Sequence, residues 1–285
     1  MIKIAWSSDV HMNSVAVASP ETPTIAGPRY LHTSKQALNQ YVDYVNDNVF
    51  DLAVCTGDLV EDEDGMVDFM EHWVNIKSSV RSELVIGNHE ISLGKAALAT
   101  GLGYGDSAEI AGSKFNQSFE ITENGVSALI LMVDSSRYDP LRSAYTGYCP
   151  EDVRTWIAGV LAASTTTNVL LFMHHSPKQY DFETVDGPVF DPDDAIALDA
   201  VFQADLVTNP TRKIKVFAGH DHGYGGVIEK TKAGFGEEWD CYINRKAIVD
   251  YAPGISGNGG FAIIKLTANG NITFELIDKI FPYTS

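Results

Sequence analysis

The sequence is poor in cationic side chains, poor in cysteine, and free of long apolar runs. Lys and Arg together number 20 against 38 Asp and Glu, so the formal net charge of the 285-residue chain is −18. Binding a phosphate backbone requires clustered cations that release counterions, and an anionic membrane surface repels an acidic protein. We therefore expect neither long nucleic acids nor membranes among its partners.

The three cysteines, Cys55, Cys149 and Cys241, are too few and too scattered for a disulfide framework. No apolar stretch approaches the ~20 residues of a membrane-spanning helix. The first residues do not combine a basic segment with the apolar run of a signal peptide. We therefore expect reduced thiols, no secretion signal and a cytoplasmic location.

The sequence does contain enough apolar material for a folded core. Hydrophobic residues make up 45% and aromatic residues 10% of the chain, which is typical of a globular protein rather than a disordered acidic one. A chain of this length buries roughly 75% of the surface that its unfolded form exposes. Because there is neither an internal repeat nor a low-complexity linker, we expect residues 1–285 to form a single domain.

Strands and helices alternate over the first ninety residues. Short apolar runs predict strands at Ile2–Trp6, Leu52–Cys55 and Leu84–Ile86. Between them, Ser34 is typical of the N-cap of a helix that reaches about Asn48, and the apolar spacing of residues 67–74 predicts a second helix facing the core through Val67, Met70, Trp73 and Val74. Continuous apolar strands joined by helices indicate a parallel sheet covered by helices.

The later part of the chain predicts a second sheet. Residues Glu123–Gly125 form a strong hairpin signal between two strand-like runs. A helix is predicted from Pro150 to about Ala163, followed by strands at Val169–Met173 and Ile214–Ala218, and the last 60 residues are rich in strand-like runs. Two long segments, 13–32 and 176–194, fit no element; loops of this length are usually functional or disordered, and we expect them beside a site.

The histidines are the most informative residues. Six of the eight lie at or just past the end of a predicted strand, each accompanied within two residues by an Asp, an Asn, a Gly or another His. The groups are Asp9-Val10-His11, Gly57-Asp58, Gly87-Asn88-His89, His174-His175 and Gly219-His220-Asp221-His222. Carboxyl ends of strands in an open α/β sheet meet at a common crevice, so five strands bring these groups to one place. Imidazole, carboxylate and amide oxygen together favour Mn, Fe, Zn or Ni over Ca.

Spacing supports this interpretation. Residues two apart in a strand point to the same side, so Asp9 and His11 can enter one site, as can His220 and His222, provided that the strand geometry continues that far. Taken singly, each fragment is common and usually without function. Five of them in order, each at a strand end, favour a metal site.

As a set, these fragments resemble the signature of the calcineurin-like metallophosphoesterases. The resemblance spans about residues 1–225 and, more weakly, the terminal strands. Val133-Asp134-Ser135, Gly147 and Trp156-Ile157 are similar to the branch of cyclic-nucleotide and glycerophosphodiester phosphodiesterases. A tyrosine in place of His11 would mark the purple acid phosphatases, and its absence argues against that branch. The resemblance implies an α/β fold: a four-layer αββα sandwich of two mixed β-sheets flanked by helices, with a dimetal site at the C-terminal ends of the strands.

The resemblance also assigns roles to individual residues. One divalent metal ion would be held by Asp9, His11, Asp58 and His222. The second would be held by Asp58, Asn88, His174 and His220, so that Asp58 bridges the two. We expect Mn, Fe or Zn at these sites. His175 and Asp221 would support the ligands or face the substrate.

The expected chemistry follows from the metal pair. Two cations ~3.5–4 Å apart can clamp an in-line displacement at phosphorus, and a hydroxide bridging them is the expected nucleophile. His89 is not a ligand in the family pattern, and we expect it to protonate the leaving alkoxide or to orient the phosphate.

The substrate is less clearly indicated than the site. We expect a small phosphodiester of the cyclic-nucleotide or glycerophosphodiester type. A phosphomonoesterase or nucleotide pyrophosphohydrolase on the same site is the alternative, and a non-catalytic interaction module is less favoured because the chain keeps every ligand. Arg137 and Tyr148 are weak candidates for substrate contacts. Equally weak candidates are Arg29, Arg142, Lys178, Arg245, Tyr30, Tyr145 and Tyr180.

Overall fold

The computed structural model describes residues 1–12, 31–139, 144–178, 190–220, 227–230, 238–244 and 260–278. Two predicted site residues, Asp221 and His222, lie outside these ranges, as do residues 13–30 and 179–189 of the two long segments. Of the weaker substrate candidates, Arg29, Tyr30, Arg142, Tyr180 and Arg245 also lie outside them.

The first sheet has five strands in the order β13-β12-β1-β2-β3. Its strands are β1 (Ile2–Ser7), β2 (Leu52–Thr56), β3 (Arg81–Val85), β12 (Gly260–Leu266) and β13 (Ile272–Asp278). Strands β1, β2 and β3 are mutually parallel, as their continuous apolar runs predict. Strand β12 runs antiparallel to β1, and β13 runs antiparallel to β12. The carboxyl ends of the first three strands therefore lie at one edge.

The second sheet has six strands in the order β10-β11-β9-β8-β5-β4. Its strands are β4 (Gln117–Glu123), β5 (Val126–Met132), β8 (Asn168–Phe172), β9 (Lys213–Ala218), β10 (Val227–Lys230) and β11 (Asp240–Asn244). Strands β5, β8, β9 and β11 are parallel. The predicted hairpin joins β4 to β5, and Asn124 and Gly125 both have the positive φ that its tight turn requires. A separate pair, β6 (Ser136–Asp139) and β7 (Ala144–Gly147), follows β5.

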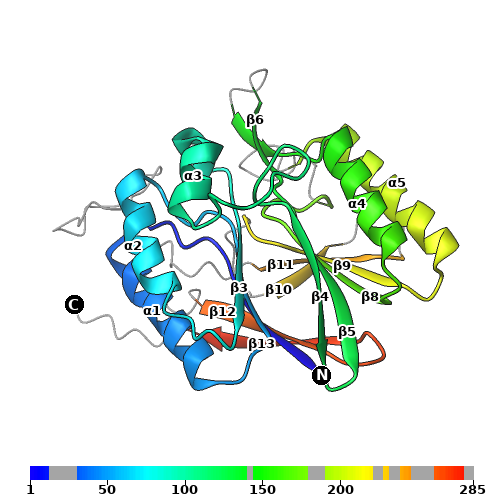
Figure 1. The fold of residues 1–285 in the computed structure, drawn as a ribbon, viewed down its shortest axis with the longest axis horizontal. Helices are drawn as coiled ribbons and strands as arrows, with labels where there is room; N and C mark the ends of the chain where they lie inside the picture. Colours follow the sequence, from blue (N-terminus) through cyan, green and yellow to red (C-terminus); the bar gives the residue numbers. More distant parts are fainter. Residues whose placement is uncertain are drawn as a thin grey trace.

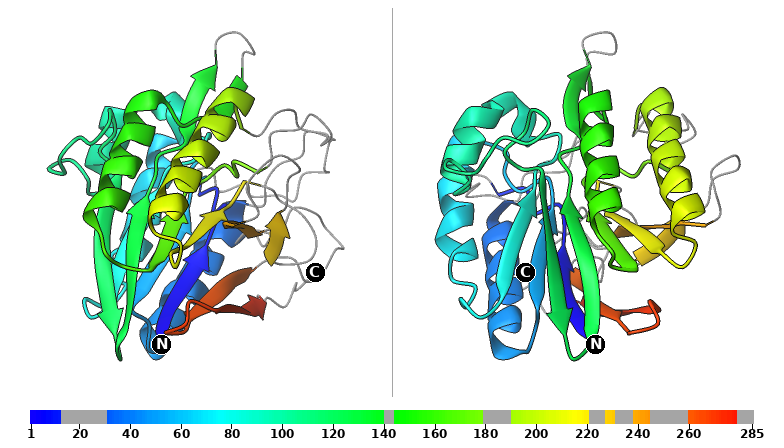
Figure 2. Two further views of the ribbon diagram at one scale, coloured as in Figure 1. Left: turned by 90° about the vertical axis from the view of Figure 1, so that its right-hand side faces the viewer. Right: turned by 45° about the vertical axis from the view of Figure 1, so that its right-hand side comes forward.

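Helices cover the outer face of each sheet. On one side lie α1 (Leu31–Asp47), α2 (Glu63–Trp73) and α3 (Lys95–Gly101), the last preceded by the short 3-10 helix η1 (Glu90–Leu93). On the other side lie α4 (Glu151–Ala163) and α5 (Pro192–Thr208), as Figures 1 and 2 show. No helix in the described part of the chain is both long and apolar enough to cross a membrane.

Three apolar cores separate these layers. The first lies between the first sheet and helices α1, α2 and α3. The second lies between the second sheet and helices α4 and α5, and the third lies between the two sheets. Alternation along each strand produces this division: Ala5 faces the helices, whereas Ile4 and Trp6 face the other sheet. The expected four-layer αββα sandwich of two mixed sheets is therefore confirmed.

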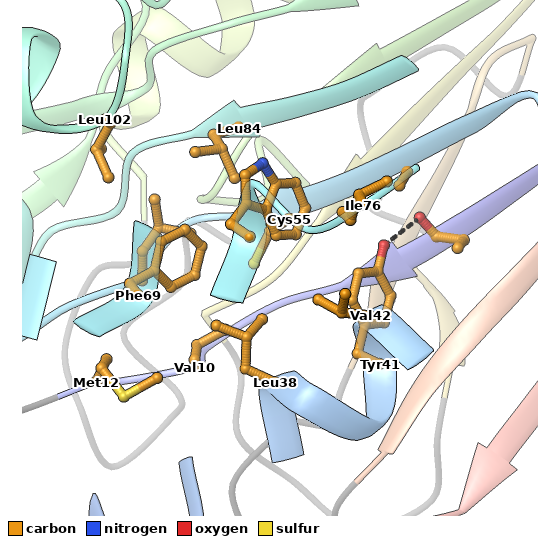
Figure 3. Close-up of a cluster of buried hydrophobic side chains, with 14 of the residues drawn as sticks. Val10, Met12, Leu38, Tyr41, Val42, Cys55, Phe69, Ile76, Leu84 and Leu102 are labelled. Carbon is orange, nitrogen blue, oxygen red and sulfur yellow. Dashed lines mark hydrogen bonds between the residues drawn. The ribbon is translucent and has the colours of Figure 1, made fainter. Parts of the chain in front are cut away.

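The helix-side core is tied to the first sheet through a buried tyrosine. Tyr41 of α1 stacks against Trp73 of α2, with 5.9 Å between ring centres. Its buried hydroxyl donates to the backbone carbonyl of Ala5 in β1 at 2.9 Å, the dashed bond of Figure 3. A buried hydroxyl without a partner would be costly, so this bond fixes how α1 lies on the sheet.

Two details of the helices differ from the sequence prediction. Helix α1 begins at Leu31, so Ser34 lies inside it and donates to the carbonyl of His11 at 3.5 Å instead of capping the helix. Val67 in α2 and Val74, which directly follows this helix, are 58% and 64% exposed. Asp62 caps α2 by accepting from the Gly65 amide at 2.6 Å. The helix turns Phe69 and Trp73 inward instead.

Candidate metal centre

The segments that follow β1 and β2 run side by side and bring two predicted ligand groups together. The amide of Asp9 donates to the carbonyl of Gly57 at 2.9 Å, and the amide of His11 donates to the carbonyl of Asp58 at 2.8 Å. Strand β1 itself ends at Ser7. The expectation that strand geometry continues to His11 is therefore wrong. Asp9 and His11 are held by these backbone hydrogen bonds instead.

Left-handed backbone is concentrated at the predicted ligands. Among the described residues, six other than glycine have a positive φ, and four of them are Asp9 (57°), His11 (49°), Asp58 (50°) and His220 (68°). This conformation is unfavourable for residues with a Cβ, by roughly 1–2 kcal/mol each. Such strain clusters at functional sites, where the surrounding structure maintains it.

Glycines allow these segments to approach one another closely. A Cβ on Gly87 would lie 2.2 Å from the Asp58 Oδ1 atom, and one on Gly57, whose φ is +85°, would lie 2.4 Å from the His174 Nδ1 atom. Neither distance is compatible with a side chain. The two glycines therefore let Asp58 and His174 pack directly against the backbone of neighbouring strands.

Asp9, His11 and Asp58 form one buried group. Each offers a ligand atom within 4.8 Å of the others, and each residue is at most 2% exposed. The His11 Nε2 atom lies 3.8 Å from the Asp58 Oδ2 atom. Oxygen and nitrogen donors at this spacing could hold a metal ion.

A second group converges on the Nε2 atom of His174. It lies 3.0 Å from the Asn88 Oδ1 atom, 3.1 Å from the His220 Nδ1 atom and 3.4 Å from the Asp58 Oδ1 atom. The other ring nitrogen of His174 lies 2.8 Å from the carbonyl of Thr56. That bond orients the ring so that Nε2 faces the group.

Burial and charge shift the pKa values of these groups. Burial opposes ionisation of Asp58, but His174, His89 and His11 outweigh it and hold its pKa well below the usual range. Burial likewise disfavours protonation of His174, but the charge and hydrogen bond of Asp58 raise its pKa to about 9. The pKa of His175 shifts in the opposite direction from that of His174. Burial lowers it most, and the charges of His174 and His220 lower it further.

His89 lies beside the first group and more open to solvent. Its side chain is 25% exposed, and its Nε2 atom is 3.7 Å from the Asp58 Oδ2 atom. Its backbone amide donates to the Asp58 Oδ1 atom at 3.1 Å. The ring packs edge-on against His11, with 4.9 Å between ring centres.

Sequence reasoning overlooked Glu61, which joins His89 to His11. Its Oε1 atom lies 2.6 Å from the His11 Nδ1 atom, and its Oε2 atom lies 2.9 Å from the His89 Nδ1 atom. Burial raises the pKa of Glu61, but the two histidines outweigh this and hold it below its usual range. The available signal was its position three residues after Asp58, at the start of the acidic run Glu61–Asp64.

Glu90 is the last residue of the Gly87-Asn88-His89-Glu90 fragment, to which sequence reasoning assigned no role. It is fully buried and accepts from the amides of Val60 and Gly87, at 2.9 and 2.6 Å. These bonds tie the segment after β3 to the segment after β2. Burial, with a further contribution from Asp58, raises the pKa of Glu90 to about 7.

The remaining predicted residues divide into three cases. His175 is buried next to the second group and lies 3.2 Å from the Ser135 hydroxyl through its Nδ1 atom. Arg137 and Tyr148 lie together in a neighbouring cavity, with the guanidinium carbon 4.2 Å from the centre of the tyrosine ring. Lys178 is buried against Trp239, to whose carbonyl it donates at 2.7 Å.

Comparisons with solved structures show the same fold in proteins of distant sequence. A dimetal phosphatase from Danio rerio is 16% identical with a TM-score of 0.64, and the match covers 96% of this chain and 98% of that one. A purple acid phosphatase from yellow lupin (Lupinus luteus) seeds is 12% identical with a TM-score of 0.59, covering 97% of this chain and 51% of that one. PhoD is 12% identical with a TM-score of 0.56, covering 96% and 68%.

No curated protein sequence matches the chain. The model of one protein family does match, that of the calcineurin-like phosphoesterases, and it spans residues 2–224. This span contains every strand end from which the described histidine and carboxylate groups project. The chain is therefore a member of the calcineurin-like phosphoesterase family.

Proposed function

We propose that this protein is a metal-dependent hydrolase of small phosphodiesters that uses two divalent cations. The observation that carries the proposal is the meeting of imidazole, carboxylate and amide donors from the ends of five strands in two groups that share Asp58. One cation would be held by Asp9, His11 and Asp58, with His222 as the fourth ligand. The other would be held by Asp58, Asn88, His174 and His220.

The hydrogen-bonding pattern of His174 fits a cation. Because its Nδ1 atom faces a carbonyl oxygen, the neutral ring carries its proton there and presents an Nε2 lone pair inward. The His174 Nε2 atom lies 3.0 Å from the Asn88 Oδ1 atom and 3.1 Å from the His220 Nδ1 atom. A divalent cation such as Mn, Fe or Zn satisfies several such acceptors at once.

The protein's own groups supply orientation and proton transfer. When bound, the two cations supply electrostatic stabilisation of the phosphate and activation of water near neutral pH. Glu61 holds His11 and His89 through their Nδ1 atoms, which leaves the His89 Nε2 atom facing the site. Partly exposed and next to Asp58, His89 is suited to protonate the leaving oxygen.

A neighbouring cavity favours a diester over a monoester. A diester carries a second organic group, and a cavity contains Arg137 and Tyr148. The Tyr148 amide donates to the carbonyl of Ser135, whose hydroxyl lies 3.2 Å from the His175 Nδ1 atom. Phosphomonoester or nucleotide pyrophosphate hydrolysis on the same centre is the alternative. Cys55, Cys149 and Cys241 are buried and form no disulfide with one another, which supports a reducing, cytoplasmic location.

Turnover of two p-nitrophenyl esters tests the proposal. With Mn²⁺, we expect the protein to hydrolyse bis(p-nitrophenyl) phosphate faster than p-nitrophenyl phosphate. Loss of a residue that only hydrogen-bonds a metal ligand typically lowers activity about 10–100-fold. Because Asp58 would itself bind both cations, Asp58→Asn should lower kcat by more than this. The exposed Asp106→Asn is the matched control and should retain activity.

Each other outcome has a defined meaning. A preference for the monoester would identify a phosphomonoesterase. Absence of turnover of either ester with Mn²⁺, Fe²⁺ and Zn²⁺ would identify a non-catalytic module. Full activity of Asp58→Asn at matched metal content would contradict the bridging role of this carboxylate.

A further inference from the structure

A cavity of about 390 Å³ lies between the start of α3, the start of α4 and the first residues of β6. Figure 1 shows β6 between these two helices. Its volume falls within the roughly 300–1,000 Å³ of small-molecule sites. Its lining includes the side chains of Lys95, Ser113, Asp134, Arg137, Tyr148 and Asp152.

Two consecutive serines connect this cavity to the metal centre. The Ser135 hydroxyl lies 3.2 Å from the His175 Nδ1 atom, and the Ser135 carbonyl accepts from the amide of Tyr148 at 2.8 Å. Ser136 lines the cavity and donates to the carbonyl of Ile86, the residue before Gly87, at 3.1 Å. The cavity wall is therefore hydrogen-bonded to the segments that carry Asn88 and His175.

The charges in the cavity are balanced internally. The Asp134 Oδ2 atom accepts from Lys95 at 2.5 Å and from the Ser113 hydroxyl at 2.7 Å. The described lining contains two cationic side chains, Lys95 and Arg137, and two carboxylates, Asp134 and Asp152. Because positive charge is not in excess, this cavity is not built to select a second phosphate or carboxylate.

One wall of the cavity provides a flat stacking surface. The guanidinium carbon of Arg137 lies 4.2 Å from the centre of the Tyr148 ring, and the Arg137 side chain is exposed. A guanidinium paired with an aromatic ring presents a planar face on which aromatic groups, including nucleobases, stack. Ala111 and Val153 add apolar lining nearby.

We propose that this cavity binds an aromatic ester group of the substrate, with Arg137 and Tyr148 as its stacking face. The substrate class is thus the phosphodiesters that carry an aryl or nucleobase-bearing group, and the inference rests on the proposed phosphodiesterase activity. Arg137 and Tyr148 determine specificity in this scheme and take no part in the bond-breaking step.

Steady-state kinetics of the Mn²⁺-loaded protein test the cavity with two diesters. One is bis(p-nitrophenyl) phosphate, and the other is glycerophosphoethanolamine, which has no aromatic group. Arg137→Ala and Tyr148→Ala should lower kcat/KM for the aryl diester about tenfold, because each removes part of the face on which the aryl group stacks. Both variants should leave kcat/KM for the alkyl diester unchanged.

Conservative variants separate stacking from charge. Tyr148→Phe keeps the ring and should retain wild-type kcat/KM, whereas Arg137→Lys keeps the charge but loses the planar face and should behave like Arg137→Ala. Equal effects on both diesters, or an active Arg137→Lys, would overturn the proposal. Because Arg137 is exposed, its variants remain informative even when Tyr148→Ala does not fold.

A binding measurement distinguishes failure of the cavity from failure of the proposed function. Calorimetry with the Mn²⁺-loaded protein should give about tenfold tighter binding of phenyl phosphate than of methyl phosphate, and Arg137→Ala should remove the difference. If the protein hydrolyses neither diester but this difference holds, the proposed activity fails and the aromatic site stands. If the two ligands bind equally, the aromatic site is wrong whatever the activity.

Discussion

His89 occupies a position between a carboxylate that orients it and a carboxylate shared by both metal groups. Glu61 binds its Nδ1 atom at 2.9 Å, and the Asp58 Oδ2 atom lies 3.7 Å from its Nε2 atom. Fixing one ring nitrogen determines which atom of the imidazole meets the substrate. The same Glu61 side chain also holds His11, so a single residue aligns a candidate ligand and a candidate acid.

The role of His89 can be tested by its substitution. We expect His89→Ala to bind metal normally but to lower kcat by about 10²–10⁴-fold, the usual contribution of a general acid. The loss should be smallest for p-nitrophenyl esters, because a good leaving group needs no protonation. The measurement is kcat across a series of aryl and alkyl diesters, with metal content determined in parallel.

His72→Ala is the matched control for this substitution. His72 lies on α2, outside the groups that could hold a metal. Its replacement should leave kcat and metal content unchanged. A loss of kcat in His89→Ala that is the same for every leaving group would argue against proton donation by this residue.

At the scale of elements, the site depends on how closely strand ends approach each other. A Cβ on Gly219, which follows β9, would lie 1.8 Å from the Ser8 Oγ atom and 3.0 Å from the Asp9 Oδ2 atom. The next residue, His220, donates its amide to the same Asp9 oxygen at 3.2 Å. The end of β9 therefore meets the end of β1 with no room for a side chain.

We expect Gly219→Ala to weaken metal binding at least tenfold, because it pushes Asp9 away from its position. Titration of the metal-free protein with Mn²⁺, followed by calorimetry, measures the change. Gly159→Ala is the control, since Gly159 lies in α4 with no atom within 4 Å of an added Cβ. That variant should be slightly more stable, by about 1 kcal/mol or less. Wild-type affinity in Gly219→Ala would show that the close approach is not needed for the site.

Helix α2 illustrates where the sequence prediction reaches its limit at this scale. Its apolar spacing correctly predicted a helix, and Trp73 is buried as expected. The same pattern wrongly placed Val67 and Val74 on the buried face and overlooked Phe69. Apolar residues occupy two faces of this helix, and packing buries the face that carries the aromatic rings of Phe69 and Trp73 rather than the face that carries Val67. Residues two apart, such as Val67 and Phe69, lie about half a turn from each other.

At the scale of the whole molecule, metal binding and folding are linked. The ligand groups come from chain segments as distant as Asp9 and His220, so they are close together only in the folded state. A cation that binds the native state alone stabilises it by about 2.7 kcal/mol when its concentration is 100 times the Kd. We therefore expect Mn²⁺ to raise Tm and a chelator to reverse the rise, in one cooperative transition of a single domain.

The rise in Tm that Mn²⁺ causes should depend on pH. Asp58 raises the pKa of His174 from 6.5 to about 9 in the metal-free protein. The pair therefore stabilises the metal-free fold fully below about pH 6.5 and loses this contribution as pH rises through about 9. A metal ion needs the neutral ring, so it displaces the proton more easily at higher pH.

Thermal unfolding at pH 6 and pH 8, with and without Mn²⁺, measures this dependence. The increase in Tm caused by Mn²⁺ should be larger at pH 8, with affinity rising by up to about tenfold per pH unit for each proton released. Ca²⁺, which prefers sites made only of oxygen donors, should give a much smaller increase. Equal increases at both pH values would show that His174 carries no competing proton.

The fold class and most of the candidate site could be predicted from local properties of the chain. Continuous apolar strands alternating with helices predict parallel sheets, and polar groups at their carboxyl ends must then meet at one edge. For this reason, Asp9, His11, Asp58, Asn88 and His174 could be grouped without coordinates. Their types and their places at strand ends are local properties of the chain.

Only the tertiary structure decided how these groups are held. The bridge from Glu61 to His11 and His89, the left-handed backbone of Asp58 and the cavity beside Ser135 all arise where distant segments meet. A local pattern specifies which face a side chain takes relative to its own strand or helix. It does not specify contacts across strand ends, because the packing of separate elements sets those distances.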